Sequence, residues 1–280
     1  MRAVSAQSLG SGSSGNGLLV TVDDQAILID CGLGPRLLGV LLAHRGLTLG
    51  HLQAVFVTHE HDDHVRGLEP LVRRKVPVFA SAGTARALNL AAGNCGTLAM
   101  ETPFAVGDFG VTPLPTSHDA AEPCGYAIRA GDARLTIVTD LGTVSPALRN
   151  WVAGADLIVI EANHDEHMLR SGPYPPHLKR RVASATGHLS NADCGLFLRQ
   201  VLDKSGRQPA IWLAHLSATN NRPELAAETV RRHLADVRPS LIEALPREAP
   251  GPVWRYAPAP RQASLGFTDE SARMPDPFGW

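Results

Sequence analysis

His59-Glu60-His61-Asp62-Asp63-His64 is the stretch that decides the fold, because it places three histidines and three carboxylates within six residues. It contains the pattern H-x-H-x-D-H and directly follows residues 54–58, an apolar, β-branched run typical of a strand buried on both faces. Imidazole and carboxylate groups hold Zn²⁺, Mn²⁺ or Fe²⁺ while leaving coordination positions free for water. The stretch therefore predicts a metal centre at the end of a buried strand.

The spacing within this stretch indicates two metal ions. In extended chain that leaves a strand, His59 and His61 point the same way and can hold one ion. As the chain turns into a helix, Asp63 and His64 move to the other side and can hold a second. Four ligands are too many for one ion that must also keep a water molecule. The alternative is a solvated turn in which Asp62 or Asp63 caps a helix.

Four more potential ligands follow apolar runs elsewhere in the chain. They are Asp30 after AILI, His118 after VTPLPTS, Asp140 after LTIVT and His215 after AIWLA. A lone histidine after a strand is usually structural or exposed. Because α/β proteins place functional loops at strand ends, four such residues beside the H-x-H-x-D-H pattern favour one shared site.

The hydrophobic pattern predicts a mixed sheet with helices outside it, an α/β sandwich rather than a regular βαβ wheel. Strands are expected at residues 3–9, 18–22, 26–30, 54–58, 77–80, 109–115, 124–130, 134–139, 156–162 and 210–215. Helices are expected around residues 37–46, 65–74, 144–153, 177–186, 190–204 and 222–235. From Pro246 onward prolines are dense and periodicity stops, so we expect one domain over residues 1–245 and an irregular tail over 246–280.

Composition narrows the class of protein. The net charge of −1 gives no global attraction to nucleic acid, so any basic surface must be local. The cysteines show no CxxC pair and are expected to be buried or half-buried free thiols, at positions 31, 95, 124 and 194. No signal-like N-terminus and no run of about 18 apolar residues is present, so a cytoplasmic protein without a membrane partner is expected.

Gly10-Ser11-Gly12-Ser13-Ser14-Gly15 fits the letters of the dinucleotide motif G-x-G-x-x-G. That motif must open a helix whose N-terminus binds the pyrophosphate, but here a predicted strand follows. A glycine-rich hairpin loop is therefore expected. The alternative is a loop whose backbone N–H groups approach a ligand.

Several longer stretches together resemble the metallo-β-lactamase superfamily, and within it the YycJ-type (WalJ) branch. They are GSGSSGNG (10–17), THEHDDH (58–64), SHDAAEPCGY (117–126), EANHDEHMLRSGPYP (161–175), KRRVASATGHLSNADCG (179–195) and HLSATNN (215–221). The resemblance covers residues 5 to 245. It implies an αββα sandwich of two mixed sheets with helices on the outer faces.

The resemblance also implies a role for each candidate residue. It assigns the first metal to His59, His61 and His118, the second to Asp63, His64 and His215, and the bridge between them to Asp140. Asp30 would orient these ligands through hydrogen bonds. His188 matches a histidine that related phosphodiesterases place near the leaving group. Further polar candidates for weak substrate contacts are Ser14, Asn16, Asn163, Ser190 and Asn191.

The function that follows is a metal-dependent phosphodiester hydrolase, and the resemblance implies a DNA exonuclease. Two divalent ions, Zn, Mn or Fe, would share a water molecule, lower its pKa toward about 7 and present hydroxide as nucleophile. Asp63 or Asp140 would receive a proton, and His188 would either give one to the leaving group or bind phosphate. The basic triplets Arg73-Arg74-Lys75 and Lys179-Arg180-Arg181 either contact DNA or are solvated helix ends.

Three alternatives stay open at this point. A small-molecule phosphodiesterase, acting on cyclic nucleotides or sugar phosphates, would use the same ligands without a basic track. A non-catalytic interaction module stabilised by metal would need saturated coordination, which fits a mixed His/Asp set poorly. Finally, Glu161, Asn163, His164 and Asp165 either cap a helix and brace the ligands or line the rim of the site.

Overall fold

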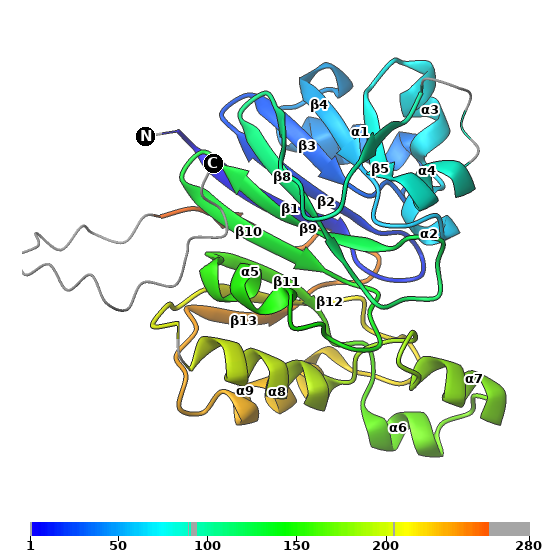
Figure 1. The fold of residues 1–280 in the computed structure, drawn as a ribbon, viewed down its shortest axis with the longest axis vertical. Coiled ribbons are helices and arrows are strands. Elements are labelled where there is room, and N and C mark those ends of the chain that lie inside the picture. Colours follow the sequence, from blue (N-terminus) through cyan, green and yellow to red (C-terminus); the bar gives the residue numbers. More distant parts are fainter. Residues whose placement is uncertain (1, 89, 91–93, 204, 258–280) are drawn as a thin grey trace, which may run out of the picture.

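The computed structural model describes residues 2–88, 90, 94–203 and 205–257, and it forms two seven-stranded sheets packed face to face (Figure 1). The first sheet has the order β14-β1-β2-β3-β4-β5-β6, and the second β13-β12-β11-β10-β9-β8-β7. The first comprises β1 Val4–Gly10, β2 Gly17–Val22, β3 Gln25–Ile29, β4 Leu52–Phe56, β5 Val78–Ser81, β6 Gly96–Leu98 and β14 Val253–Arg255. The second comprises β7 Phe104–Val106, β8 Phe109–Pro115, β9 Cys124–Ala130, β10 Ala133–Val138, β11 Leu157–Glu161, β12 Ala210–Ala214 and β13 Leu241–Ala244.

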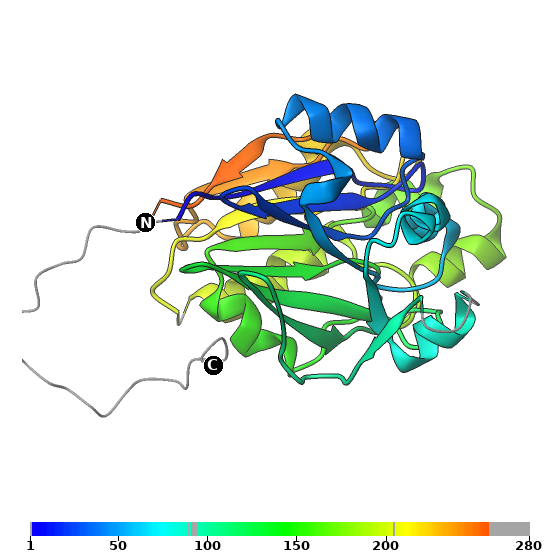
Figure 2. The same ribbon diagram turned by 90° about the horizontal axis from the view of Figure 1, so that it is seen from above.

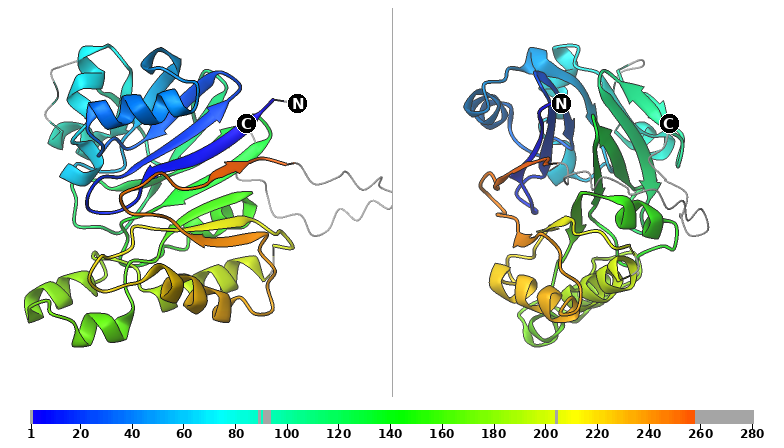
Figure 3. Two further views of the ribbon diagram at one scale, coloured as in Figure 1. Left: turned by 180° about the vertical axis from the view of Figure 1, so that it is seen from behind. Right: turned by 90° about the vertical axis from the view of Figure 1, so that its left-hand side faces the viewer.

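Helices cover the outer face of each sheet, which makes four layers (Figures 2 and 3). The helices are α1 Pro35–His44, α2 Asp62–Val65, α3 Leu68–Arg73, α4 Ala82–Ala87, α5 Leu148–Gly154, α6 Glu166–Ser171, α7 Pro176–Val182, α8 Asn191–Leu202 and α9 Pro223–His233, with a 3₁₀ turn at Leu49–His51. The αββα sandwich expected from the sequence is confirmed. It arises because the central strands are apolar on both faces, so each sheet must be covered twice.

Three hydrophobic clusters correspond to the three interfaces between these layers. The inter-sheet cluster includes Phe56 and Tyr126. The cluster beneath α1 includes Leu38 and Leu42, which the spacing of that helix turns toward the first sheet. The third lies between the second sheet and α5, α8 and α9. The first sheet is thereby fixed rigidly against the second, which matters because both contribute residues to the site.

The predicted helix over residues 65–74 is divided, and several short elements were not predicted. The break lies at Gly67, where a Cβ atom would collide with the backbone oxygen of Leu33. The strands β6, β7 and β13 and the helices α4 and α6 have three to six residues each. Segments that short show too little periodicity to be recognised from sequence.

The expected domain boundary at residue 245 needs a correction. β14, Val253–Arg255, pairs antiparallel with β1 and adds an edge strand to the first sheet, with Ser5 opposite Arg255. Backbone pairing does not require apolar periodicity, which is why a proline-rich segment concealed this strand. The remainder of the predicted tail, residues 258–280, lies outside the described residues, and there its irregularity stays a prediction.

The carboxyl ends of several strands meet at one end of the sandwich. β3 and β4 are parallel neighbours in the first sheet, and β10, β11 and β12 are parallel neighbours in the second. The loops after these strands carry the residues singled out above, and α2, α6 and α7 lie at the same end (Figures 1 and 3). In the described part of the chain, none of the helices has the length and apolarity that crossing a bilayer would take.

Candidate metal centre

The first group of candidate ligands comprises His59, His61 and His118, which have ligand atoms within 4.8 Å of one another. His59 and His61 leave the end of β4, and His59 Nε2 lies 3.1 Å from His61 Nδ1. His118 follows β8, and its Nδ1 lies 3.1 Å from the Gly187 carbonyl oxygen, to which it can donate. That hydrogen bond leaves His118 Nε2 facing the other two rings.

The second group of candidate ligands contains His64 together with its neighbour Asp63 and the strand-end residue His215. Asp63, His64 and His215 again have ligand atoms within 4.8 Å of one another. Asp63 Oδ2 is 3.6 Å from His64 Nε2 and 3.5 Å from His215 Nε2. The two groups expected from the spacing within the H-x-H-x-D-H stretch are therefore both present in the fold.

Asp140 lies between the two groups. Its Oδ2 is 3.3 Å from His64 Nε2, and its Oδ1 is 3.9 Å from His118 Nε2 and 3.1 Å from His215 Nδ1. Asp140 is 2% exposed, so bulk water cannot hydrate its carboxylate, and a buried charge of this kind needs a partner of opposite charge. Asp140 can share a metal group with His59 and His64, and another with Glu161, His188 and His215, and the bridging role that the resemblance implied for it stays a prediction.

Three strand-end residues of the cluster have left-handed backbone conformations. Asp30, Asp140 and His215 have φ of 60°, 54° and 54°. Such conformations are uncommon for residues with a side chain and persist where surrounding packing enforces them. Each one turns the chain sharply after β3, β10 or β12, so that its side chain points across the end of the sandwich.

Asp30 contacts the ligands through hydrogen bonds, as expected for an orienting residue. Its Oδ2 lies 2.8 Å from His64 Nδ1 and accepts from Thr58 Oγ1 at 2.9 Å, and its Oδ1 accepts from the Thr58 backbone N–H at 2.8 Å. Asn16 Nδ2 is 3.0 Å from both Asp63 Oδ2 and His64 Nε2. These contacts fix the ring of His64 with its Nε2 directed at Asp63 and Asp140.

We expect Asp30→Asn to lower metal affinity by about 10–100-fold, the usual effect of removing a hydrogen-bond partner of a ligand. The amide keeps the volume of the side chain but cannot accept from His64 and Thr58 on both sides. Competition with a chromogenic chelator measures the affinity. The exposed turn variant Asp24→Asn serves as the control and should bind as the wild type does.

The cluster fits divalent cations, because buried lone pairs face one another across it. His64 Nδ1 contacts Asp30, so its Nε2 is the ring atom directed at Asp63 and Asp140. Asp140 Oδ2 and His215 Nε2 are buried without a hydrogen-bond partner among the described residues. Although burial lowers it, the carboxylates of Asp30 and Asp140 raise the pKa of His64 to about 10. The negative charge of these two carboxylates favours a positive charge at His64, and a bound divalent cation would balance the same negative charge.

Glu161 is one of the four residues whose role the sequence left open, and the structure places it inside the cluster of candidate ligands. It ends β11 with no exposed surface, and its Oε1 lies 2.8 Å from His188 Nδ1 and 3.0 Å from His215 Nδ1. Its Oε2 accepts from the backbone N–H of Leu141 and Leu189. Although burial lowers the pKa of His188, Glu161 raises it overall. Its position after an apolar strand, like that of Asp140, was the available sequence signal.

The candidates for substrate contact need correction at two positions. Asn163 and Asn191 are 6% and 1% exposed, and their amides donate to the His215 carbonyl and to Asn221 Oδ1. These two residues hold loops together and are not free to meet a substrate. Ser190 caps α8 by accepting from the Asp193 backbone N–H, and it also lines a pocket beside His188, so its contact with substrate stays a prediction. Asn16 braces Asp63 and His64, and Ser14 is exposed and bonds to Glu248.

The hairpin interpretation of the glycine-rich stretch is confirmed, because residues 11–16 join the antiparallel strands β1 and β2. The four cysteines are free thiols, three buried and one half-buried, as expected.

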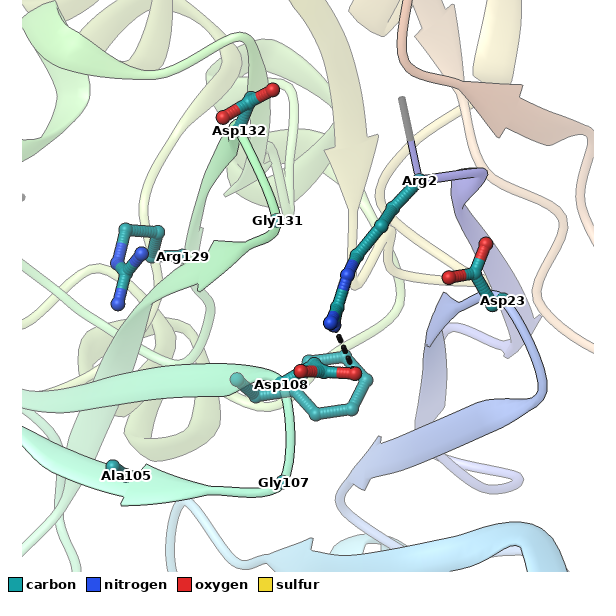
Figure 4. A pocket seen from close by; sticks show the side chains of 9 residues that line it. Arg2, Asp23, Ala105, Gly107, Asp108, Arg129, Gly131 and Asp132 are labelled. Atoms are coloured by element: carbon teal, nitrogen blue, oxygen red, sulfur yellow. Dashed lines mark ion pairs between the residues drawn. The ribbon is translucent and has the colours of Figure 1, made fainter.

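A pocket of about 690 Å³ lies away from the candidate ligands, and Figure 4 shows the side chains that line it. It lies among the turns β2–β3, β7–β8 and β9–β10, where Arg2 forms an ion pair with Asp108. These turns lie at the opposite strand ends from Asp30 and Asp140. The pocket therefore shares no residue with the metal centre.

The sequence profile of the β-lactamase superfamily domain matches residues 25–205. The chain belongs to this superfamily. It is 39% identical over 235 residues to exodeoxyribonuclease YycJ of Bacillus anthracis, which covers 81% of this chain and 88% of that protein. It is 35% identical to exodeoxyribonuclease WalJ of Streptococcus pneumoniae, over 81% of this chain and 87% of that protein. The metallo-β-lactamase fold protein YhfI of Bacillus subtilis superposes with a TM-score of 0.68 at 20% identity, over 91% of this chain and all of YhfI, which supports the fold.

Proposed function

We propose that this protein is a dinuclear metal-dependent phosphodiester hydrolase that acts as an exodeoxyribonuclease. The observation that carries the proposal is the position of Asp140 between two groups of ligand atoms, beside His188. Relatives named exodeoxyribonucleases, 35–39% identical over four-fifths of this chain, support DNA as the substrate.

In this proposal His59, His61 and His118 would hold one divalent ion, Asp63, His64 and His215 would hold the other, and Asp140 would be a ligand to both. Zn and Mn suit these His/Asp ligands, and Fe is an alternative. When bound, two such ions supply Lewis acidity for the phosphodiester and activate a water molecule near neutral pH. The chain's own task is to hold the donor atoms at this spacing before substrate arrives, which the packing of two sheets against each other achieves.

Proton transfer in this proposal uses Asp63 and His188. Asp63 is the least buried carboxylate of the cluster, with a side chain 21% exposed, so it can receive a proton at the open side. His188 has its Nδ1 fixed by Glu161, which leaves Nε2 as the atom that can donate to the departing oxygen. Its ring centroid lies 5.2 Å from that of His118 and 5.3 Å from that of His215, so it borders both ligand groups.

The two basic triplets differ in how they are placed for DNA. On α7, Arg181 bonds to Asp119, the residue after the ligand His118, while Lys179 bonds to the end of α6. Arg180 between them is exposed. On α3, by contrast, the triplet ends a helix that starts beside Gly67 and leads away from the cluster. We therefore assign the phosphate contact to Arg180 on α7.

Arg180→Ala should weaken DNA binding without changing hydrolysis of a small ester. A lost phosphate contact reduces the slope of log K against log salt by about 0.9 on duplex DNA. Fluorescence anisotropy at several salt concentrations measures the slope with catalytically inactive protein. Arg74→Ala on α3 is the matched control, and an equal change there would refute the assignment to α7.

The experiment that tests the function as a whole uses metal-stripped protein refilled with Mn²⁺ or Zn²⁺. Hydrolysis of bis(p-nitrophenyl) phosphate is followed beside cleavage of DNA labelled at the 5′ or the 3′ end. Stepwise loss of nucleotides from one end supports the exonuclease. Hydrolysis of the small ester alone, with cyclic nucleotides as further substrates, would replace it by a small-molecule phosphodiesterase.

A further inference from the structure

A smaller pocket of about 250 Å³ adjoins the metal centre and shares His188 with it. Its walls come from α6, from the turn after α7 and from the loop that precedes α8, the three segments that gather at this end of the molecule (Figure 1). His188 therefore faces the candidate ligands on one side and this pocket on the other. No step of the proposed hydrolysis uses the space.

His164 lines this pocket with an unsatisfied polar atom. The residue is 3% exposed, and its Nδ1 has no hydrogen-bond partner in the described part of the chain. Leaving a buried donor or acceptor unpaired costs about 1–3 kcal/mol, so a partner arriving with a ligand would be favoured. Burial lowers the pKa of His164, so the ring is neutral and offers one donor and one acceptor.

The charge and size of the pocket select an uncharged group. Two carboxylates, Glu166 and Asp193, line it opposite Arg170 and His188, whose pKa Glu161 raises, so the opposite charges balance and give a doubly charged terminal phosphate no net attraction. Leu169 and Ala183 add apolar wall. A volume of about 250 Å³ is below the usual range of about 300–1,000 Å³ for small-ligand pockets, and it suits one planar ring system rather than several nucleotides.

We propose that this pocket receives the nucleobase of the terminal nucleotide of a DNA strand. The proposal rests on the exonuclease function and gives it a structural cause. A base seated beside His164 places the first phosphodiester of the strand next to His188 and the metal centre. Base edges carry both donors and acceptors, which match a neutral imidazole, and base faces match an apolar wall. The pocket would thus measure one nucleotide from the strand end.

The test removes the terminal base from the DNA in one arm and fills or alters the pocket of the protein in the other. Metal-loaded full-length protein is given DNA with a tetrahydrofuran residue in place of the nucleoside at the attacked end, or the intact strand. We expect the wild type to lose about tenfold in kcat/KM without the base. In His164→Ala, and in Ala183→Trp, which fills the pocket from an exposed position, the two strands should be cleaved with equal efficiency. His167→Ala, exposed on α6, is the control and should keep the tenfold difference.

Three results would overturn the proposal while the exonuclease function stands. The first is equal cleavage of both strands by the wild type, and the second is a tenfold preference that survives in Ala183→Trp. The third is a rate that depends on the terminal phosphate instead of the base, which would make this a phosphate site. If the wild type hydrolyses bis(p-nitrophenyl) phosphate but no DNA, the exonuclease proposal fails separately. Deoxyadenosine is then tested as an inhibitor of ester hydrolysis: inhibition that Ala183→Trp relieves supports the base pocket, and no inhibition overturns it.

Discussion

His61→Ala is expected to lower phosphodiester turnover by roughly 10³-fold or more while the protein still folds. A ligand to one ion supports several kcal/mol of transition-state charge stabilisation, and that contribution disappears when the ion is lost. His61 is half-buried in the turn before α2 and belongs to none of the three hydrophobic clusters. Its removal should therefore affect the site far more than the core.

The measurement combines turnover, metal content and thermal unfolding of the same preparation. We expect the metal content to fall by about one ion per chain, since one of two ligand groups loses a member, with the unfolding of the variant still cooperative. His44→Ala on the exposed side of α1 is the matched histidine control. Wild-type turnover in His61→Ala would refute the ligand assignment, whatever the metal content.

His188→Ala is expected to retain both metal ions but to slow cleavage of DNA by roughly 10²–10⁴-fold, the usual contribution of a general acid. The alkoxide leaving group of DNA needs a proton, whereas p-nitrophenolate leaves readily without one. The loss on bis(p-nitrophenyl) phosphate should therefore be much smaller. Comparing kcat for the two substrates at fixed pH gives this difference directly.

Glu161→Gln tests how far the action of His188 depends on the carboxylate that contacts its Nδ1. The amide has nearly the volume of the carboxylate but no negative charge and a single acceptor oxygen, so it cannot accept both from the two histidines and from the backbone N–H groups of Leu141 and Leu189. We expect the same leaving-group dependence as in His188→Ala, with a smaller amplitude. An equal loss on the activated ester in both variants would show that His188 binds phosphate and does not donate a proton.

The sequence predicted the parts of this protein that depend on neighbouring residues. Runs such as those of β4 and β11 are apolar on both faces, so their strands and the layered fold could be inferred from local pattern. The candidate ligands of the H-x-H-x-D-H stretch are likewise local, because a strand end followed by a helical turn brings His59, His61 and His64 to one place, where the ring centroids of His59 and His64 lie 4.1 Å apart. Asp140 and His215 were recognised because each directly follows a clear strand.

Only the tertiary structure decided what depends on residues far apart in the chain. Glu161 lies 27 residues from His188 and 54 from His215. The parallel pairing of β11 with β12 brings it beside His215, and the hydrogen bond from the Leu189 backbone N–H holds the His188 loop against it. Asn191 looked available for substrate until Asn221, 30 residues away, was found to bind its amide. Polar side chains of one type serve ligands, caps or loop contacts according to burial and partners. Because those are set by the packing of two sheets, the sequence by itself determined the fold and predicted the candidate ligands, and the three-dimensional arrangement determined which polar side chains are engaged in loop contacts.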